Sequence, residues 1–190
     1  TLQMGIVKDD INSITDLLQT SLLKADIVVT TGGVSVGDYD FVQDVIKDKL
    51  KAEVLFHGVD IKPGMHLLIA LKDNKIIIAL PGFAYSSTVC AILYVLPLIY
   101  KFRNSNEKLP IVKARINEDF RRFQAKTIFT ACNVEYINNE YQINFDGKKS
   151  GTSAILTNML ESPALLIQKE NSQDIKSGDL VDILLLNNIK

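Results

Sequence analysis

The stretch TTGGVSVGDYD, Thr30 to Asp40, decides the fold of the first half of the chain. It follows the β-branched run Ile27–Thr31, which shows no alternation of polar and apolar residues and is therefore predicted to be a central strand covered on both faces. A helical pattern begins at about Asp40, and its apolar residues share one face: Val42, Val45, Ile46 and Leu50. A buried strand, a glycine-rich turn and a helix in this order predict an α/β domain.

The residues on either side of this stretch extend the same pattern. Thr1–Val7 is predicted to be a strand, and Asp10 is placed to cap a helix that ends near Lys24. The apolar stripe of that helix has the helical period: Ile14, Leu17, Leu18, Ser21 and Leu22. Val54–Phe56 is the next predicted strand, and the alternation of strands and helices predicts parallel βαβ units.

A hairpin and a long apolar segment follow. His66–Leu71 and Lys75–Leu80 are predicted strands, and Lys72-Asp73-Asn74 between them is typical of an Asx-type turn. Pro81-Gly82 then leads into the apolar run Thr88–Tyr100. This run is 13 residues long. A membrane span needs about 20 residues, so we predict a buried helix instead.

The second half of the chain shows a different pattern. The polar stretch Arg103–Lys108 predicts a domain boundary, so that an α/β domain with three α/β/α layers covers residues 1–104 and a small all-β, barrel-like domain covers residues 109–190. Short alternating runs predict the strands of the second domain: Ile111–Ile116, Thr127–Val134, Tyr141–Phe145, Ala164–Ile167 and Leu180–Leu186.

Composition argues against several classes of protein. The formal net charge is -1 and the basic residues are scattered, so we expect no nucleic-acid partner, and the absence of a long apolar segment predicts no membrane partner. Cys90 and Cys132 lie far apart, without further ligands at zinc spacing, and are predicted to be core thiols in a reducing cytoplasm. The chain begins at Thr1 without a targeting segment, and we expect a cytoplasmic fragment.

The glycine-rich stretch is the strongest candidate for a ligand site. Beyond the carboxyl end of a strand, glycines let backbone N–H groups approach an anion, and a helix N-terminus favours negative charge. Thr31 and Ser35 would add hydroxyl donors, while Asp38 and Asp40 would hold a divalent cation that bridges to phosphate or molybdate oxygens. The alternative is a plain tight turn with an aspartate that only caps the helix.

Several motifs in the same order resemble a known family. GGVSVGDYDFV (32–42), FHGVDIKPG (56–64) and LPG (80–82) are similar to the molybdopterin-binding domain family, and in particular to MoeA and the gephyrin E domain. The resemblance also covers GIVKDD (5–10) and the serine- and glycine-containing stretch 150–158. It implies a MogA-like fold for the first domain, with its first strand and an N-terminal region lying before Thr1.

The resemblance also implies a function. Members of this family insert molybdenum from molybdate into adenylylated molybdopterin, with Mg²⁺ as cofactor and release of AMP. It implies a phosphorylated pterin as the small-molecule substrate, a homodimer when full length, and a molybdopterin adenylyltransferase as partner.

Carried over by position, the resemblance assigns roles to individual residues. Catalytic roles fall on Asp9, Asp40 and Lys62. Asp40 keeps the metal-binding role that the residue types of the loop already give to Asp38 and Asp40. Lys62 would stabilise an anionic ligand as a point charge, with a solvated surface lysine as the alternative. Pterin contacts are assigned to the two glycine turns and their neighbours: Thr31, Gly32, Gly33, Ser35, Gly37, Pro63, Pro81, Gly82 and Ser86.

Two departures from the family pattern leave other functions open. Where the family reads PGKP this chain has Pro63-Gly64-Met65-His66, and where the family reads PGNP it has Pro81-Gly82-Phe83-Ala84. The first departure removes one cation and the second removes one amide side chain. Near neutral pH, His66 would replace the lost cation only in part. The alternatives are a module that binds a pterin or nucleotide without chemistry, and an interaction scaffold like gephyrin.

The remaining charged residues are interpreted as structural. His57 has no carboxylate or cysteine at metal-ligand spacing and is predicted to be a half-buried strand residue. Arg115, Arg121 and Arg122 are predicted to lie on a solvated face, with contact to an anionic ligand as the alternative.

Overall fold

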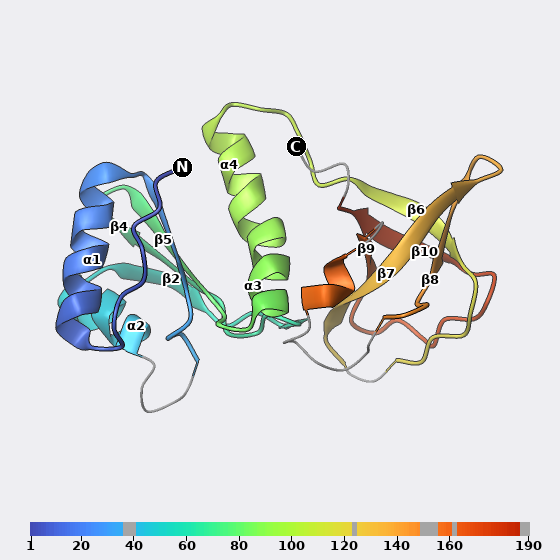
Figure 1. Ribbon diagram of the computed structural model, residues 1–190, viewed down its shortest axis with the longest axis horizontal. Helices are drawn as coiled ribbons and strands as arrows, with labels where there is room; N and C mark the ends of the chain where they lie inside the picture. Colours follow the sequence, from blue (N-terminus) through green and yellow to red (C-terminus); the bar gives the residue numbers. More distant parts are fainter. Residues whose placement is uncertain (36–40, 123–124, 149–155, 161–162, 187–190) are drawn as a thin grey trace. The chain divides into compact units, whose positions relative to one another are not determined.

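The structure is a computed structural model that describes residues 1–35, 41–122, 125–148, 156–160 and 163–186 (Figure 1). The chain divides into two compact units by its contacts. The first contains Thr1–Val59 and Gly64–Cys90, and the second contains Asp60–Pro63 and Ala91–Lys190.

The first unit has three layers built on a mixed sheet. The sheet order is β1-β5-β4-β2, with β1 parallel to β5 and the other two pairs antiparallel. The helices α1 and α2 lie on one side of the sheet and α3 lies on the other (Figure 1). The strands are β1 (Ile27–Thr31), β2 (Glu53–His57), β4 (Leu68–Lys72) and β5 (Lys75–Leu80). The helices are α1 (Ile11–Lys24), α2 (Phe41–Asp44), which continues as the π-helical η1 (Val45–Lys49), and α3 (Ala84–Cys90).

The first helix forms as its sequence pattern indicates. The Asp10 carboxylate accepts a hydrogen bond of 2.9 Å from the Ser13 N–H, which satisfies one of the orphan donors of the first turn. Its apolar stripe is buried in a cluster with residues of η1, β1, β4 and β5: Ile14, Leu18, Leu22, Val28, Val45, Ile46, Leu68, Ala70, Ile77 and Ala79. The predictions of the Asp10 cap and of this stripe are confirmed.

Two expectations for the first unit are wrong. Thr1–Val7 is not a strand, because its backbone has no ladder partner among the described residues. Among the described strands of this sheet, β1 lies at an edge rather than at the centre, and Val29 is 42% exposed. The strands β1, β2 and β5 run in the same direction, as expected of a βαβ unit, and β4 runs opposite to them, as expected of the predicted hairpin.

The hairpin between β4 and β5 turns at two residues. Asp73 and Asn74 both have positive φ, 50° and 62°, which asparagine and aspartate tolerate better than most residues. The predicted hairpin is confirmed, with Lys72 belonging to β4 and not to the turn.

The predicted long helix forms but is only partly buried. From Ala84 the chain stays helical through α3, the π-helical η2 (Ala91–Val95) and α4 (Leu96–Phe102). Tyr85, Val89, Cys90 and Tyr100 are buried, whereas Phe102 is 50% exposed. The helix is therefore amphipathic and not a core helix throughout. The division between the two units falls inside this helix, and the boundary between residues 104 and 109 stays a prediction.

The second unit contains a closed five-stranded β-barrel. The strands follow one another in the order β7-β8-β6-β10-β9, and the antiparallel pairing of β7 with β9 closes the ring. The two-residue strand β3 (Ile61–Lys62) adds to β7 in parallel. The barrel strands are β6 (Ile111–Ile116), β7 (Thr127–Ile137), β8 (Glu140–Asn144), β9 (Pro163–Gln168) and β10 (Leu180–Leu185), and a short 3₁₀ helix, η3, covers Leu156–Met159. The sequence predicted all five barrel strands and missed β3.

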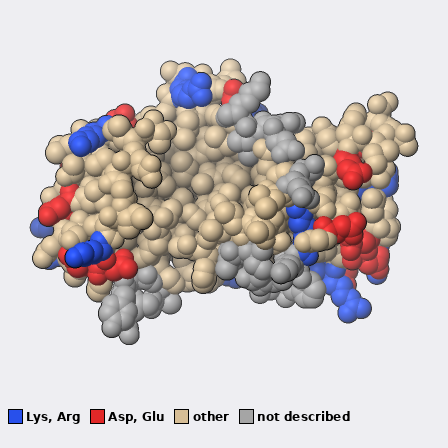
Figure 2. All heavy atoms as spheres, viewed as in Figure 1, with Lys and Arg blue, Asp and Glu red and all other residues tan. Residues whose placement is uncertain are grey.

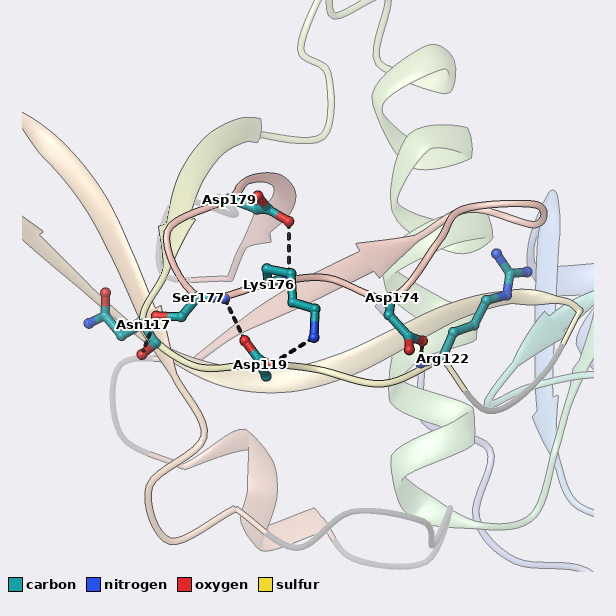
Figure 3. Close-up of polar contacts among 7 residues, drawn as sticks. All are labelled: Asn117, Asp119, Arg122, Asp174, Lys176, Ser177 and Asp179. Atoms are coloured by element: carbon teal, nitrogen blue, oxygen red, sulfur yellow. Dashed lines mark hydrogen bonds and ion pairs between the residues drawn. The ribbon is translucent and has the colours of Figure 1, made fainter.

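Polar contacts fix the loops at one end of the barrel (Figure 3). The Asp119 carboxylate accepts from the Lys176 ammonium and from the Ser177 N–H, both at 2.9 Å. The Arg122 N–H donates to the Asp174 carboxylate at 2.8 Å. Carboxylates that accept backbone N–H groups hold irregular segments in one conformation, so these loops form part of the barrel structure.

Candidate functional site

Two glycine turns meet at the carboxyl ends of the parallel strands β1 and β5. The Gly32 N–H donates to the Leu80 carbonyl at 3.0 Å, which ties the end of β1 to the end of β5. A methyl group built on Gly82 would lie 3.4 Å from the Gly32 Cα. The two backbones approach this closely because neither residue has a side chain, as expected where a ligand approaches the main chain.

Gly33 is fixed by both its conformation and its neighbour. Its φ is +66°, and a methyl group built on it would lie 2.6 Å from Val42 Cγ2. Its carbonyl accepts from the Val42 N–H at 3.1 Å, so the turn leads directly into α2. Only glycine combines this backbone conformation with the space that α2 leaves.

Hydroxyl groups surround the two turns. The Thr30 hydroxyl, near the end of β1, is buried and has no hydrogen-bond partner among the described residues. Thr31 and Ser35 are exposed, and Ser86, on α3, is buried. Neutral donors of this kind suit an anion that must be held without a full counter-charge. The sequence analysis missed Thr30, although the TTGG motif contains it.

His57 contacts the same turn from β2. Its Nε2 lies 3.4 Å from the Val34 carbonyl, and the ring is half-buried. The prediction of a half-buried strand residue is confirmed, and the contact places His57 as a support of the turn that leads to Ser35.

The other described site residues lie on other segments of the chain. Asp9 is exposed, in the loop before α1. Lys62 is half-buried and Pro63 is buried, and both belong to the second unit. The predicted residues that the structure brings together are Thr31, Gly32, Gly33, Pro81 and Gly82, with Ser35 and Ser86 on the adjoining segments.

The metal assignment cannot be placed. Gly37, Asp38 and Asp40 lie outside the described residues. Within the part of the chain that the structure describes, no three histidine, cysteine, aspartate or glutamate side chains gather at metal-binding distance. The assignment of magnesium to Asp38 and Asp40 therefore stays a prediction.

Two of the three arginines are held by protein groups. The Arg115 guanidinium binds the Glu140 carboxylate through two hydrogen bonds of 2.8 and 2.9 Å, and this contact lowers the pKa of Glu140. The Arg122 guanidinium donates to the backbone carbonyls of Lys169 and Ser172, both at 2.7 Å. These contacts favour a structural role over binding of an anionic ligand. On the face drawn in Figure 2, basic side chains lie in small separate groups beside acidic ones.

The two cysteines are unreactive thiols. Both are buried, and burial raises the pKa of Cys90 and of Cys132 to about 12. Thiols with such pKa values stay protonated near neutral pH and are poor nucleophiles.

One helix passes a length and hydropathy test for a membrane span. This is Ala84–Phe102, found among the described residues, and 28% of its most apolar window is buried. Core helices of globular proteins pass the same test, so this feature is weak evidence for a membrane segment.

Comparisons with known proteins give the family. Residues 1–101 match the sequence profile of the probable molybdopterin binding domain. A molybdopterin molybdenumtransferase from Staphylococcus aureus strain Mu50 is 31% identical over 195 aligned positions, which cover 97% of this chain and 44% of the relative. One from Staphylococcus epidermidis is 28% identical with the same coverage. The chain thus spans less than half of these curated relatives.

Solved structures agree with the fold. A crystal structure of the molybdopterin biosynthesis MoeA protein from Pyrococcus horikoshii superposes with a TM-score of 0.75 at 24% identity, covering 96% of this chain and 42% of the other. A molybdenum cofactor biosynthesis protein from Pyrococcus furiosus gives a TM-score of 0.69 at 19% identity, covering 95% and 56%. Both units of the fold are therefore found in MoeA-type proteins. The profile match covers residues 1–101, a stretch that includes both glycine turns. The chain therefore belongs to the molybdopterin-binding domain family.

Proposed function

We propose that the protein carrying this chain inserts molybdenum from molybdate into adenylylated molybdopterin, with release of AMP. The observation that carries the proposal is the meeting of the turns Gly32-Gly33 and Pro81-Gly82 at the carboxyl ends of β1 and β5. In open α/β sheets, ligands bind at this end of the strands. The names of the curated relatives support the same reaction.

The proposed binding step uses backbone and hydroxyl donors. Backbone N–H groups of the Gly32 turn, with the Thr31 and Ser35 hydroxyls, would hold the pterin phosphate. The exposed Gly82 leaves the approach to this turn open, because no side chain stands above it. Donors fixed by the fold need no reorganisation when the phosphate arrives, and this favours binding and orientation.

Charged residues would orient the second substrate. We assign Asp9, Asp40 and Lys62 to the reaction, with Lys62 as a point charge toward the anionic ligand. The proposal assigns Mg²⁺ to Asp38 and Asp40 on sequence position alone, and the binding step does not depend on the ion. An ion held there would supply positive charge toward the anionic substrates.

Two positions favour a second candidate, a domain that binds the pterin without transferring metal. Met65 is 41% exposed and Phe83 is 62% exposed, and apolar side chains at these positions add no charge or hydrogen bond to an anion. Polar side chains at these two positions that contact only the transition state would raise the rate of insertion without raising the affinity for the pterin. Their replacement by Met65 and Phe83 would therefore reduce the rate more than the affinity.

The same proposal extends to assembly and location. We propose a homodimer for the full-length protein, a cytoplasmic location, and delivery of the adenylylated substrate by a molybdopterin adenylyltransferase. Each part follows from the family resemblance.

Molybdate insertion into adenylylated molybdopterin by the full-length protein tests the proposal. We expect turnover by the wild type and a loss of at least about tenfold in Asp40→Ala. Asp48→Ala, at an exposed aspartate of η1, is the control and should keep full turnover. Tight pterin binding without turnover in the wild type would favour the binding-only candidate, and neither binding nor turnover would refute both.

A further inference from the structure

Gln168, the last residue of β9, carries a buried amide that lacks a hydrogen-bond partner. The residue is 1% exposed, and both its Oε1 and its Nε2 are buried and unpaired in the described structure. It follows Ala164 and Leu166 along the strand, and both of these belong to the barrel core. By the alternation of side chains in a strand, the amide points to the same side. A buried amide of this kind is costly unless a donor or acceptor reaches it.

Strand pairing places Lys62 two strands away from Gln168, at the same level of the sheet. Ile128 of β7 is paired with Lys62 of β3 on one edge and with Gln168 of β9 on the other. Residues in register across neighbouring strands share a face, so all three side chains leave the sheet on the same side. Two strand spacings separate Lys62 from Gln168, about 10 Å between Cα atoms. A lysine and a glutamine side chain together span that distance.

Other cations near this end of the barrel already have partners. The Lys126 ammonium lies 3.0 Å from the Asp60 carboxylate, and the Arg122 guanidinium is held by backbone carbonyls. Lys62 is half-buried, and its flexible stem allows the ammonium to turn toward the barrel end. It is the cation that the register brings to the amide.

We propose that Gln168 is a positioning residue whose amide oxygen accepts a hydrogen bond from the Lys62 ammonium, in a lysine rotamer other than the one in which the amide is left unpaired. This contact would satisfy the amide oxygen and hold the lysine in one rotamer, pre-organised for an anionic ligand. The part of the proposal that concerns the ligand rests on the proposed function, whereas the contact itself does not.

A double-mutant cycle on the 190-residue chain tests the contact without any ligand. Lys62→Met and Gln168→Met keep the side-chain length and remove one partner each. The shifts in urea midpoint should be non-additive, with the double variant losing less than the sum of the single losses. Lys62→Met combined with Gln173→Met, an exposed glutamine in the following loop, is the control pair and should be additive. Additive shifts for Lys62 and Gln168 would overturn the proposal.

A spectroscopic readout covers the case in which Gln168→Met does not fold. In Lys62→Met alone, the side-chain amide resonances of Gln168 should move, while those of Gln173 should stay in place. A shift confined to Gln168 would indicate the contact, because general loosening of the barrel would move other amide resonances as well. Unmoved Gln168 resonances would overturn the contact.

Affinity for molybdopterin then tests the positioning role. Loss of one positioning hydrogen bond should weaken binding about fivefold in Gln168→Met, with Gln173→Met unchanged. If the cycle shows coupling but Gln168→Met binds molybdopterin as tightly as the wild type, the contact stands and the positioning role is overturned. A wild type that binds no pterin would refute the proposed function, and the cycle would still decide the contact.

Discussion

Comparison of Gly33→Ala with Gly147→Ala separates the free-energy cost of a steric clash from the cost of a left-handed backbone. Gly33 has φ +66°, and the added methyl group would lie 2.6 Å from Val42 Cγ2. Gly147, in the second unit, has φ +70° and nothing within 4 Å of an added methyl group. The two glycines therefore share the backbone strain and differ in the clash.

The structure gives the expected magnitudes. A left-handed backbone costs a non-glycine residue about 1–2 kcal/mol, which applies to both substitutions. Forcing extra volume into a packed site adds about 1–3 kcal/mol, which applies only to Gly33→Ala. We expect a loss of about 2–5 kcal/mol in the free energy of unfolding for Gly33→Ala, and about 1–2 kcal/mol for Gly147→Ala. In a Val42→Ala background the Gly33→Ala loss should fall by about 1–3 kcal/mol.

Hydrogen exchange along a urea gradient, read by mass spectrometry, is a suitable assay because it reports each unit separately. Peptides from β5 report the first unit and peptides from β10 report the second. Gly33→Ala should lower the β5 midpoint, and Gly147→Ala should lower the β10 midpoint by less. Equal losses for the two substitutions, or no relief from Val42→Ala, would refute the reasoning about the clash.

Three further outcomes follow from the structure. Neither Cys90 nor Cys132 should react with iodoacetamide at pH 8 in the native protein, because burial raises the pKa of each thiol to about 12; rapid labelling without urea would contradict this. The pKa of Glu140 is lowered by Arg115, so the contribution of this pair to stability is present above the unfolded pKa of about 4 and is lost as pH falls further. Thermal unfolding of Glu140→Gln should depend less on pH between 6 and 3 than that of the wild type, and parallel curves would contradict the assignment. Arg122→Met should lose about 1–3 kcal/mol in β10 hydrogen exchange, because no donor then reaches the carbonyls of Lys169 and Ser172; an unchanged β10 midpoint would show that these hydrogen bonds are dispensable.

Elements decided by neighbouring residues were predictable from the sequence. The Asp10 cap, the Asp73-Asn74 turn and the alternating barrel strands all depend on contacts within a few residues or on side-chain periodicity. Thr1–Val7 has strand-like composition, but a strand also needs a partner in the ladder, which composition does not supply. The edge position of Ile27–Thr31 was missed for a related reason, because an apolar run does not reveal how many neighbours a strand has.

The candidate site was predictable as a set of motifs and not as a geometry. Gly32-Gly33 and Pro81-Gly82 were both identified, but their contact depends on the parallel pairing of Thr31 with Leu80. The pairing of Lys62 with Ile128, and so its approach to Gln168, likewise arises from a two-residue strand that has no recognisable pattern.

Equilibrium binding of molybdopterin to Gly82→Val tests the glycine site most directly. Gly82 is exposed and its φ is not positive, but the Cβ of a valine would lie 3.4 Å from the Gly32 Cα and its branches would crowd the Gly32 turn. An unchanged urea midpoint of the first unit is therefore required before the affinities are compared. The account predicts at least about a tenfold loss of affinity, which corresponds to about 1.4 kcal/mol, with full affinity in the exposed control Ala125→Val. A folded Gly82→Val protein that binds molybdopterin as tightly as the wild type would contradict it.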